Sequence, residues 1–165
     1  MLVFFSLFTA LLLVVIDYLT KALVVLKVKP VGDITVIEGW LKWSYRENTG
    51  AAFSMFSDSR YIFLISTTVL MALCLYLLFF KYRTNGLMCF IFALILGGGA
   101  GNMIDRVALG YVVDFIHLSF FSAIFNFADC CVTLGASILS VAIIISMVKE
   151  HQENRKKQAE TPEES

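Results

Sequence analysis

Four long apolar runs limit this chain to a fold that crosses a membrane several times. The runs cover about 2–26, 61–80, 87–104 and 123–148 of the 165 residues, and 59% of the chain is hydrophobic. A helix needs roughly 20 apolar residues to cross the hydrocarbon core of a bilayer, and it satisfies its own backbone hydrogen bonds there. We therefore expect an all-α membrane protein with four transmembrane helices.

The rest of the chain is too short for a second domain. We predict one membrane-embedded domain over 1–150 and a disordered cytoplasmic tail over 151–165, which is charged and poor in apolar residues. The formal net charge of zero gives no electrostatic basis for binding nucleic acid. The four cysteines lie in apolar runs without metal-ligand spacing, so they are predicted to be packing residues.

The positions of lysine and arginine predict the orientation in the membrane. Lys81 and Arg83 lie in the short turn between the second and third runs, and three more basic residues lie at 155–157. Basic residues are enriched in cytoplasmic segments, and four spans place both ends of the chain on one side. We expect both termini in the cytoplasm, although the segment between the first two runs, about Lys27 to Arg60, also carries five basic residues.

The first loop, about 30–58, contains a strand pattern. Apolar and polar residues alternate in Leu41-Lys-Trp-Ser-Tyr-Arg46, which is typical of a half-buried strand. Ile34 and Val36 indicate a partner strand across the turn-like Glu38-Gly39. Tryptophan and tyrosine favour the membrane interface. The pattern predicts a small sheet on the outer leaflet, with an ordinary structured loop as the alternative.

Charged residues inside the spans are predicted to pair with one another. Asp17 and Lys21 are four residues apart, so they share one helix face and are expected to form an ion pair. Asp105 is expected to pair with Arg106 or with Lys21, which suits a structural role. The run Gly97-Gly-Gly-Ala-Gly101 predicts close packing of the third span against a neighbouring helix.

Asp114 and Asp129 are the residues that we predict to carry chemistry. Each has apolar neighbours and is expected at a helix end: Asp114 follows Val112-Val113, and Asp129 follows Phe127-Ala128. Apolar surroundings raise the pKa of a carboxyl group, and two adjacent carboxyls share one proton, as in aspartic proteases. One can then take a proton from water while the other polarises a carbonyl. Asn48 and Asn126 are candidates either to orient a carboxylate or to bind the substrate backbone.

Other hydrolytic mechanisms lack their residues. His117 and His151 are the only histidines, and neither has a nucleophilic partner at a recognisable spacing. The sequence has no HExxH motif and no Cys/His cluster. No metal or other cofactor is expected.

Five short motifs occur in order along the chain. They are Asp17-Tyr-Leu-Thr-Lys21, Asn48-Thr-Gly-Ala-Ala-Phe53, Gly101-Asn-Met-Ile-Asp-Arg106, Val112-Val-Asp-Phe115 and Phe125-Asn-Phe-Ala-Asp129. One motif alone carries little information, but five in this order on four spans are specific. Over nearly its whole length the chain resembles the lipoprotein signal peptidases, also called signal peptidase II.

The resemblance implies a bacterial inner-membrane aspartyl endopeptidase with four helices and a small periplasmic β-structure. It implies a prolipoprotein substrate whose cysteine carries diacylglycerol, with cleavage just before that cysteine. It also implies both termini in the cytoplasm and an active site near the periplasmic face. We expect contact with membrane lipid and a monomeric enzyme.

Residue roles follow from the same resemblance. It implies that Asp114 and Asp129 are the catalytic pair. It implies roles in substrate binding or positioning for Asn48, Gly50, Asn102, Arg106 and Asn126. Asp17, Lys21 and Asp105 are implied to be structural charges. Cys130 departs from the serine that is common in the family after the second aspartate.

A small proton-coupled membrane transporter is the alternative prediction. Carboxylates inside a membrane also serve as proton relays. The carboxylates of this chain gather at one end of the predicted bundle and not along a path through it, which favours the peptidase.

Overall fold

The computed structural model describes residues 1–50 and 59–160 and contains four long apolar helices. They are α1 (Leu2–Lys27), α2 (Ser59–Tyr76), which continues as the π-helical turn η2 (Leu77–Lys81), α3 (Gly86–Ala108) and α4 (Phe127–Glu160). Each is long and apolar enough to cross a membrane. The prediction of four transmembrane helices is confirmed.

The central helix of the bundle is α3, which packs against each of the other three. Its glycine run makes the close approaches that the sequence predicted. A Cβ atom built on Gly97 would lie 2.9 Å from Leu13 Cβ on α1, and one built on Gly101 would lie 2.5 Å from Asp17 Oδ2. Neighbouring helices therefore approach α3 at distances that leave no room for a side chain at these positions.

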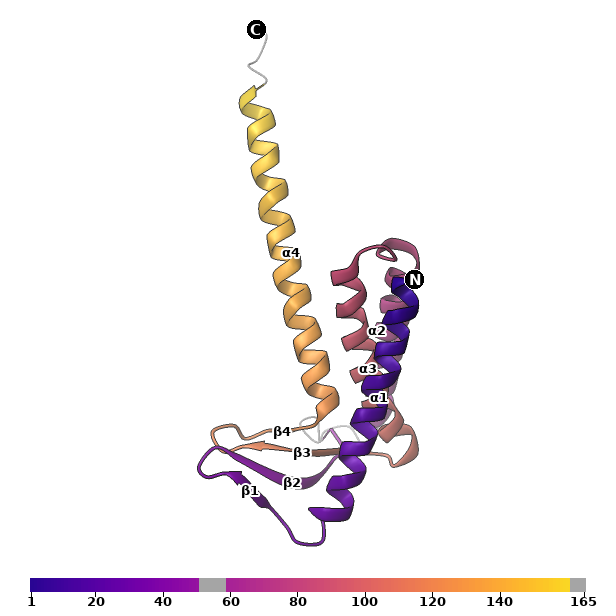
Figure 1. Ribbon diagram of the computed structural model, residues 1–165, viewed down its shortest axis with the longest axis vertical. Helices are drawn as coiled ribbons and strands as arrows, with labels where there is room; N and C mark the ends of the chain where they lie inside the picture. Colours follow the sequence, from indigo (N-terminus) through magenta and orange to yellow (C-terminus); the bar gives the residue numbers. More distant parts are fainter. Residues whose placement is uncertain (51–58, 161–165) are drawn as a thin grey trace.

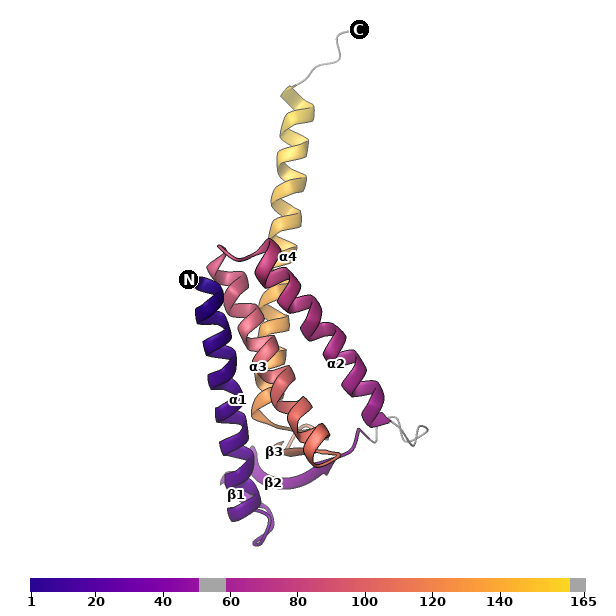
Figure 2. The ribbon, with the colours of Figure 1, turned by 90° about the vertical axis from the view of Figure 1, so that its right-hand side faces the viewer.

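A four-stranded antiparallel sheet lies at one end of the bundle (Figure 1). Its order is β1 (Ile34–Ile37), β2 (Leu41–Asn48), β3 (Val112–Leu118) and β4 (Ile124–Phe125). The predicted hairpin in the first loop is present as β1 and β2. The N-terminus and the turn between η2 and α3 lie toward the opposite end, and α4 extends beyond the bundle there (Figures 1 and 2).

The two remaining strands correct the predicted positions of Asp114 and of the fourth span. Asp114 was expected at a helix end, but it lies within β3, opposite Arg46 of β2. The fourth span was predicted from residue 123, but β4 occupies Ile124–Phe125 and α4 begins at Phe127. β3 is a strand because it pairs with β2, which comes from the first loop and is far away in sequence. The apolar residues around Asp114 do not indicate this pairing.

The burial of β2 departs from strict alternation. Ser44 is fully buried, whereas Trp43, expected on the half-buried face, is 45% exposed. The pairing of β2 with β3 shifts register between Trp43 and Arg46. A bulge of this kind interrupts the alternation of side chains along a strand.

The predicted tail over 151–165 is not disordered throughout, because α4 continues to Glu160. Lysine, glutamate, glutamine, arginine and alanine dominate this segment, and all are strong helix formers. Lys149 and Glu153 also have opposite charges four residues apart. The low hydrophobicity of this segment predicted disorder. The intrinsic helix propensity of its residues favours a helix even though the segment has no hydrophobic core to pack against. Residues 161–165 lie outside the described residues.

Candidate active site

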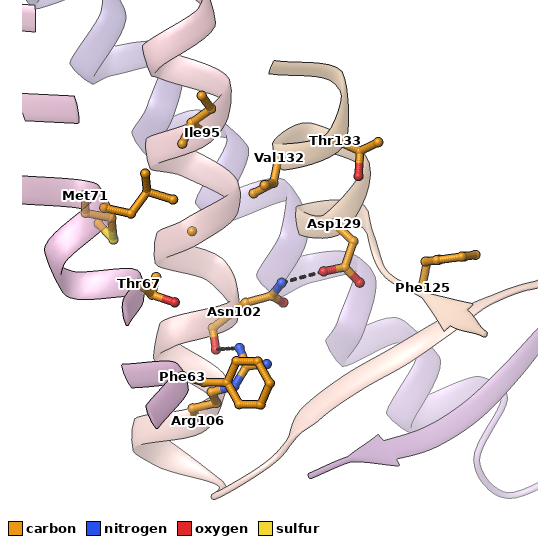
Figure 3. Close-up of a pocket in the computed structure, with 12 residues that line it drawn as sticks. Phe63, Thr67, Met71, Ile95, Asn102, Arg106, Phe125, Asp129, Val132 and Thr133 are labelled. Atoms are coloured by element: carbon orange, nitrogen blue, oxygen red, sulfur yellow. Dashed lines mark hydrogen bonds between the residues drawn. The ribbon is translucent and has the colours of Figure 1, made fainter. Parts of the chain in front are cut away.

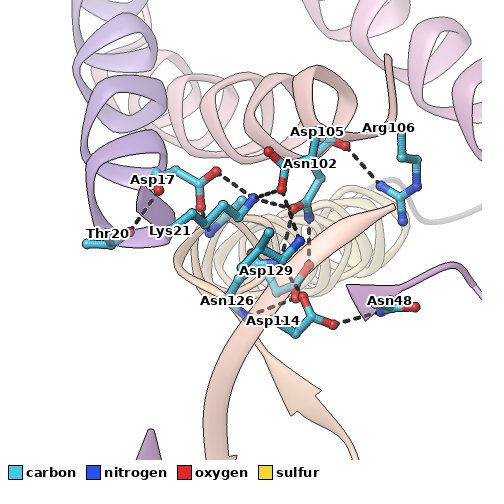
Figure 4. A network of polar contacts seen from close by, with 12 residues as sticks. Asp17, Thr20, Lys21, Asn48, Asn102, Asp105, Arg106, Asp114, Asn126 and Asp129 are labelled. Atoms are coloured by element: carbon cyan, nitrogen blue, oxygen red, sulfur yellow. Dashed lines mark hydrogen bonds and ion pairs between the residues drawn. The ribbon is translucent and has the colours of Figure 1, made fainter. Parts of the chain in front are cut away.

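Asn126 joins the two predicted catalytic aspartates (Figure 4). Its side-chain Nδ2 donates to Asp114 Oδ1 at 2.7 Å, and its backbone N–H donates to Asp129 Oδ2 at 3.1 Å. Asn126 is completely buried and lies between the end of β4 and the start of α4. The fold therefore brings a carboxylate from the middle of a strand to a carboxylate in the first turn of a helix.

The start of α4 is a capping box that fixes Asp129. Asn126 Oδ1 accepts a hydrogen bond from the backbone N–H of Asp129 at 2.9 Å. The Asp129 carboxylate accepts in return from the backbone N–H of Asn126. This reciprocal pair satisfies two backbone donors that the helix itself leaves unpaired. Asp129 therefore occupies one defined position at the helix N-terminus.

Three asparagine amides point their NH2 groups at the two aspartates. Asn48 donates to Asp114 Oδ2 at 2.8 Å, and Asn102 donates to Asp129 Oδ1 at 2.7 Å. The third is Asn126, described above. All four carboxylate oxygens thus accept a hydrogen bond from a protein N–H group.

The orientation of each amide follows from the donor on its oxygen. The Lys21 ammonium donates to Asn102 Oδ1 at 3.1 Å, and the backbone N–H of Gly50 donates to Asn48 Oδ1 at 2.8 Å. The backbone N–H of Asp129 fills the same role for Asn126. Because an ammonium or backbone N–H can only donate, each amide must turn its oxygen toward it and its NH2 toward a carboxylate.

Gly50 adopts a conformation that favours glycine. Its φ is +81°, which L side chains rarely adopt, and its N–H orients Asn48. The implied role of Gly50 is therefore a backbone one. The rest of its motif, residues 51–53, lies outside the described residues.

Lys21 forms ion pairs with both of the predicted structural aspartates, Asp17 and Asp105. Its ammonium lies 2.7 Å from Asp17 Oδ2 and 3.0 Å from Asp105 Oδ2, and only 5% of its side chain is exposed. The predicted pair between Asp17 and Lys21 is confirmed. Of the two partners predicted for Asp105, the structure has Lys21, because the helix directs adjacent side chains such as Asp105 and Arg106 to different faces.

Arg106 lies on the side of α3 that faces α2. Its guanidinium lies 4.8 Å from the ring centroid of Phe63 and donates to the Asn102 carbonyl at 3.3 Å (Figure 3). The stacking on Phe63 was not predicted, because nothing in the sequence near Phe63 indicates a cation partner. Arg106 is thereby held at the edge of the site.

Two apolar cavities meet at Asp129. The first, about 360 Å³, lies between α2, α3 and α4 and includes Asn102 and Arg106 in its wall (Figure 3). The second, about 380 Å³, runs along α4 and includes Cys130. Both share Phe125, Asp129 and Thr133. A substrate with two apolar arms can therefore reach the Asp129 carboxylate from the lipid-facing side of the bundle.

A family model described as Signal peptidase (SPase) II matches residues 9–145 of this chain. The chain belongs to the signal peptidase II family. A lipoprotein signal peptidase of Caldanaerobacter subterraneus is 42% identical over 131 residues, which make up 79% of this chain and 90% of the relative. One of Chlorobium phaeobacteroides is 41% identical in an alignment 145 positions long that covers 80% of this chain and 91% of the relative.

A solved structure agrees with this assignment to signal peptidase II. It is described as a bacterial membrane enzyme determined by the in meso method at 1.9 Å resolution. It superposes with a TM-score of 0.79 at 30% sequence identity, covering 84% of this chain and 91% of that one. The chain is a multi-pass bacterial membrane protein, and the transporter alternative receives no support from these relatives.

The cysteines of this signal peptidase II are not all packing residues. Cys74, Cys89 and Cys131 are buried, as predicted, but Cys130 is exposed and lines the second cavity. Adjacent residues of a helix point in different directions, so Cys131 faces the bundle while Cys130 does not. The position after Asp129 therefore borders the space that a substrate would enter.

Asp114 titrates above the usual range of an aspartate. Its pKa is raised to about 6, chiefly by burial. The hydrogen bonds from Asn48 and Asn126 and the charge of Lys21 lower this pKa, and the nearby Asp129 raises it. Folding thus favours the protonated form of Asp114. This contribution to stability is complete below the unperturbed value of 3.8 and is lost as pH rises through about 6.

Asp114→Asn should therefore flatten the pH dependence of stability. The parent loses stability as Asp114 ionises, and the variant does not. The free energy of unfolding of the variant minus that of the parent is therefore expected to increase by about 2 kcal/mol between about pH 4 and about pH 8. Thermal unfolding in detergent micelles across this range measures the difference. A gap between variant and parent that stays constant with pH would contradict the assignment.

Proposed function

We propose that this chain is an aspartyl endopeptidase that removes the signal peptide from diacylglyceryl-modified prolipoproteins, with the cut just before the lipidated cysteine. Membership of the signal peptidase II family supports the reaction. The observation that carries the assignment of residues is the pair of bonds from one buried asparagine, Asn126, to both Asp114 and Asp129.

The proposed mechanism uses the two carboxyls with one shared proton. The ionised carboxylate takes a proton from water, and the resulting hydroxide adds to the carbon of the scissile carbonyl. The protonated carboxyl gives its proton to the carbonyl oxygen, which forms a neutral gem-diol. A proton then passes to the leaving nitrogen and the C–N bond breaks. The products are a carboxylate on the signal peptide and a free amine on the lipidated cysteine.

The three asparagine amides and the Arg106 guanidinium have different proposed roles. Asn48, Asn102 and Asn126 have their NH2 groups committed to the aspartates, so we assign them to holding carboxylates and not to binding peptide. Arg106 lines the first cavity beside Asp129, and we assign it to a substrate carbonyl. Its five N–H donors suit an oxygen acceptor.

The substrate has two apolar parts, and two apolar cavities meet at Asp129. We propose that these cavities receive the hydrophobic segment of the signal peptide and the acyl chains. We further propose that the enzyme is a monomer in the inner membrane, in contact with its lipid. Basic residues at the end opposite the sheet support cytoplasmic termini and a periplasmic site.

Cleavage should depend on the lipid. We expect kcat/KM for an unlipidated precursor to fall about 10- to 100-fold, since losing apolar contacts worth about 1.5–3 kcal/mol corresponds to that factor. Purified protein in detergent or proteoliposomes is given matched lipidated and unlipidated precursors, and products are separated by gel electrophoresis. Failure to cleave the lipidated precursor would refute the proposed function. Equal cleavage of both would refute the role of the lipid.

A further inference from the structure

Lys21 has three partners, and each leads to one of the two aspartates. Asp17 accepts from the backbone N–H of Ala128 at 2.9 Å, next to Asp129. Asp105 accepts from the backbone N–H of Val113 at 3.1 Å, next to Asp114. The third partner is Asn102, which reaches the Asp129 carboxylate directly. All three ammonium hydrogens are therefore used in this three-armed junction.

The third arm is not symmetric between the two aspartates. The Lys21 ammonium donates to Asn102 Oδ1, and the Asn102 NH2 donates to Asp129 Oδ1. A cation on the oxygen of an amide polarises it and strengthens its N–H donor. Asp129 thus receives a hydrogen bond backed by a positive charge, which stabilises its ionised form.

Helix geometry adds to this difference. Asp129 lies in the first turn of α4, where the helix dipole favours negative charge, and it caps the backbone N–H of Asn126. Asp114 lies in the middle of β3, is 2% exposed and receives hydrogen bonds from the amides of Asn48 and Asn126. Among the described residues, the amides that donate to Asp114 are not contacted by a lysine, and the Lys21 charge acts on Asp114 only through space.

We propose that Lys21 is a positioning residue that, through Asn102, keeps Asp129 as the ionised member of the pair and leaves the proton on Asp114. Asp129 is then the base that activates water, and Asp114 is the acid that protonates the carbonyl oxygen. This inference rests on the proposed function and assigns the two roles that the shared-proton mechanism leaves open.

Several charged or titratable groups lie around the pair of aspartates and enter the design of a test. They are Asp17 and Lys21 on α1, Asp105 and Arg106 on α3, Asp114 on β3, and the Cys130 thiol beside it on α4. Removing Lys21 alone would leave two buried carboxylates unpaired and would threaten folding. The double variant Lys21→Met/Asp105→Asn removes one charge of each sign, and the amide oxygen introduced at 105 keeps an acceptor for Val113. It leaves one carboxylate without its cation in place of two: Asp17, which keeps the hydrogen bond from Ala128.

The test is the pH dependence of kcat/KM for the lipidated precursor. Its acidic limb reports ionisation of the base in the free enzyme. In the double variant we expect this limb to move to higher pH by about one unit, the scale of one charge-assisted hydrogen bond. A limb that stays in place while the rate falls at every pH would overturn the proposal, because Lys21 would then act only on the structure.

Asp17→Asn is the matched control. It keeps an acceptor for Ala128 and leaves the bond from Lys21 to Asn102 in place, but it removes one negative charge near Asp129. Its acidic limb should stay or move to lower pH. An upward shift equal to that of the double variant would overturn the proposal, since any disturbance of the junction would then have the same effect.

A second measurement needs neither activity nor the double variant. Infrared spectra of Asp114→Asn follow the titration of the Asp129 carboxyl, and spectra of Asp129→Asn follow that of Asp114, each after subtraction of the variant with both changes. We expect the Asp129 carboxyl to ionise at the lower pH, and the reverse order would overturn the proposal. If the parent protein fails to cleave the lipidated precursor, the proposed function fails, whatever these spectra show.

Discussion

Asp114→Asn and Asp129→Asn should each reduce cleavage of a lipidated precursor by about 10³-fold or more. A positioned acid or base contributes typically 10²–10⁴-fold, and residues that act as a unit lose most of their joint effect when either is removed. Each substitution replaces an oxygen with an NH2 group that neither accepts a proton from water nor donates one to a carbonyl. Single-turnover cleavage with excess enzyme measures the chemical step directly.

Asp33→Asn is a suitable control for this experiment. Asp33 is an aspartate on the exposed loop before β1, where it lies 3.5 Å from Arg46 and has a side chain that is 36% exposed. Exposed pairs of this kind contribute little to stability, so cleavage should stay within about twofold of the parent. Both active-site variants should still insert and give the elution profile of the parent. Near-normal cleavage by either one would refute the shared-proton mechanism.

Gly101→Ala should destabilise the protein by about 3 kcal/mol, because it combines overpacking with disruption of a buried ion pair. The added methyl group would lie 2.5 Å from Asp17 Oδ2 and 3.4 Å from Ala128 Cβ. Asp17 has no free space to retreat into, since it is 2% exposed and bonded to both Lys21 and Ala128. Either α1 moves away from α3 or the junction around Lys21 breaks.

Gly99→Ala provides the comparison within the same helix. A methyl group there would meet Met71 and Thr67 at 3.5–3.6 Å, which is ordinary van der Waals contact. Both changes replace a helical glycine by alanine, so both gain about 1 kcal/mol from helix propensity. Thermal unfolding in detergent should therefore show Gly101→Ala well below Gly99→Ala. Similar melting temperatures would mean that α1 and α3 are not closely packed at Asp17.

Patterns within short segments of the sequence correctly predicted the elements that form from residues close together in the chain. The four helices follow from the length of the apolar runs, and the pair of Asp17 with Lys21 follows from helical spacing. The hairpin of β1 and β2 follows from alternation and a glycine turn. In each case the residues that decide the structure lie within a few positions of one another.

Elements that depend on distant partners were predicted incorrectly or left open. β3 forms because β2, from the first loop, offers it an edge, and four of its seven residues are buried without alternation. Asp105 had two possible partners, and the packing of α1 against α3 selected Lys21. The bond from Lys21 to Asn102 joins residues 81 positions apart, and no local pattern marks it.

The amino-acid sequence alone therefore predicts that this chain spans a membrane four times and that Asp114 and Asp129 are its candidates for chemistry. Burial of a carboxyl in apolar surroundings is costly, and that cost is visible from the neighbouring residues alone. The difference between the two aspartates becomes visible only in the folded protein, because it depends on hydrogen bonds from other helices and strands. Asp129 lies at a helix start and receives an amide backed by Lys21, whereas Asp114 lies in a strand and receives amides without such support.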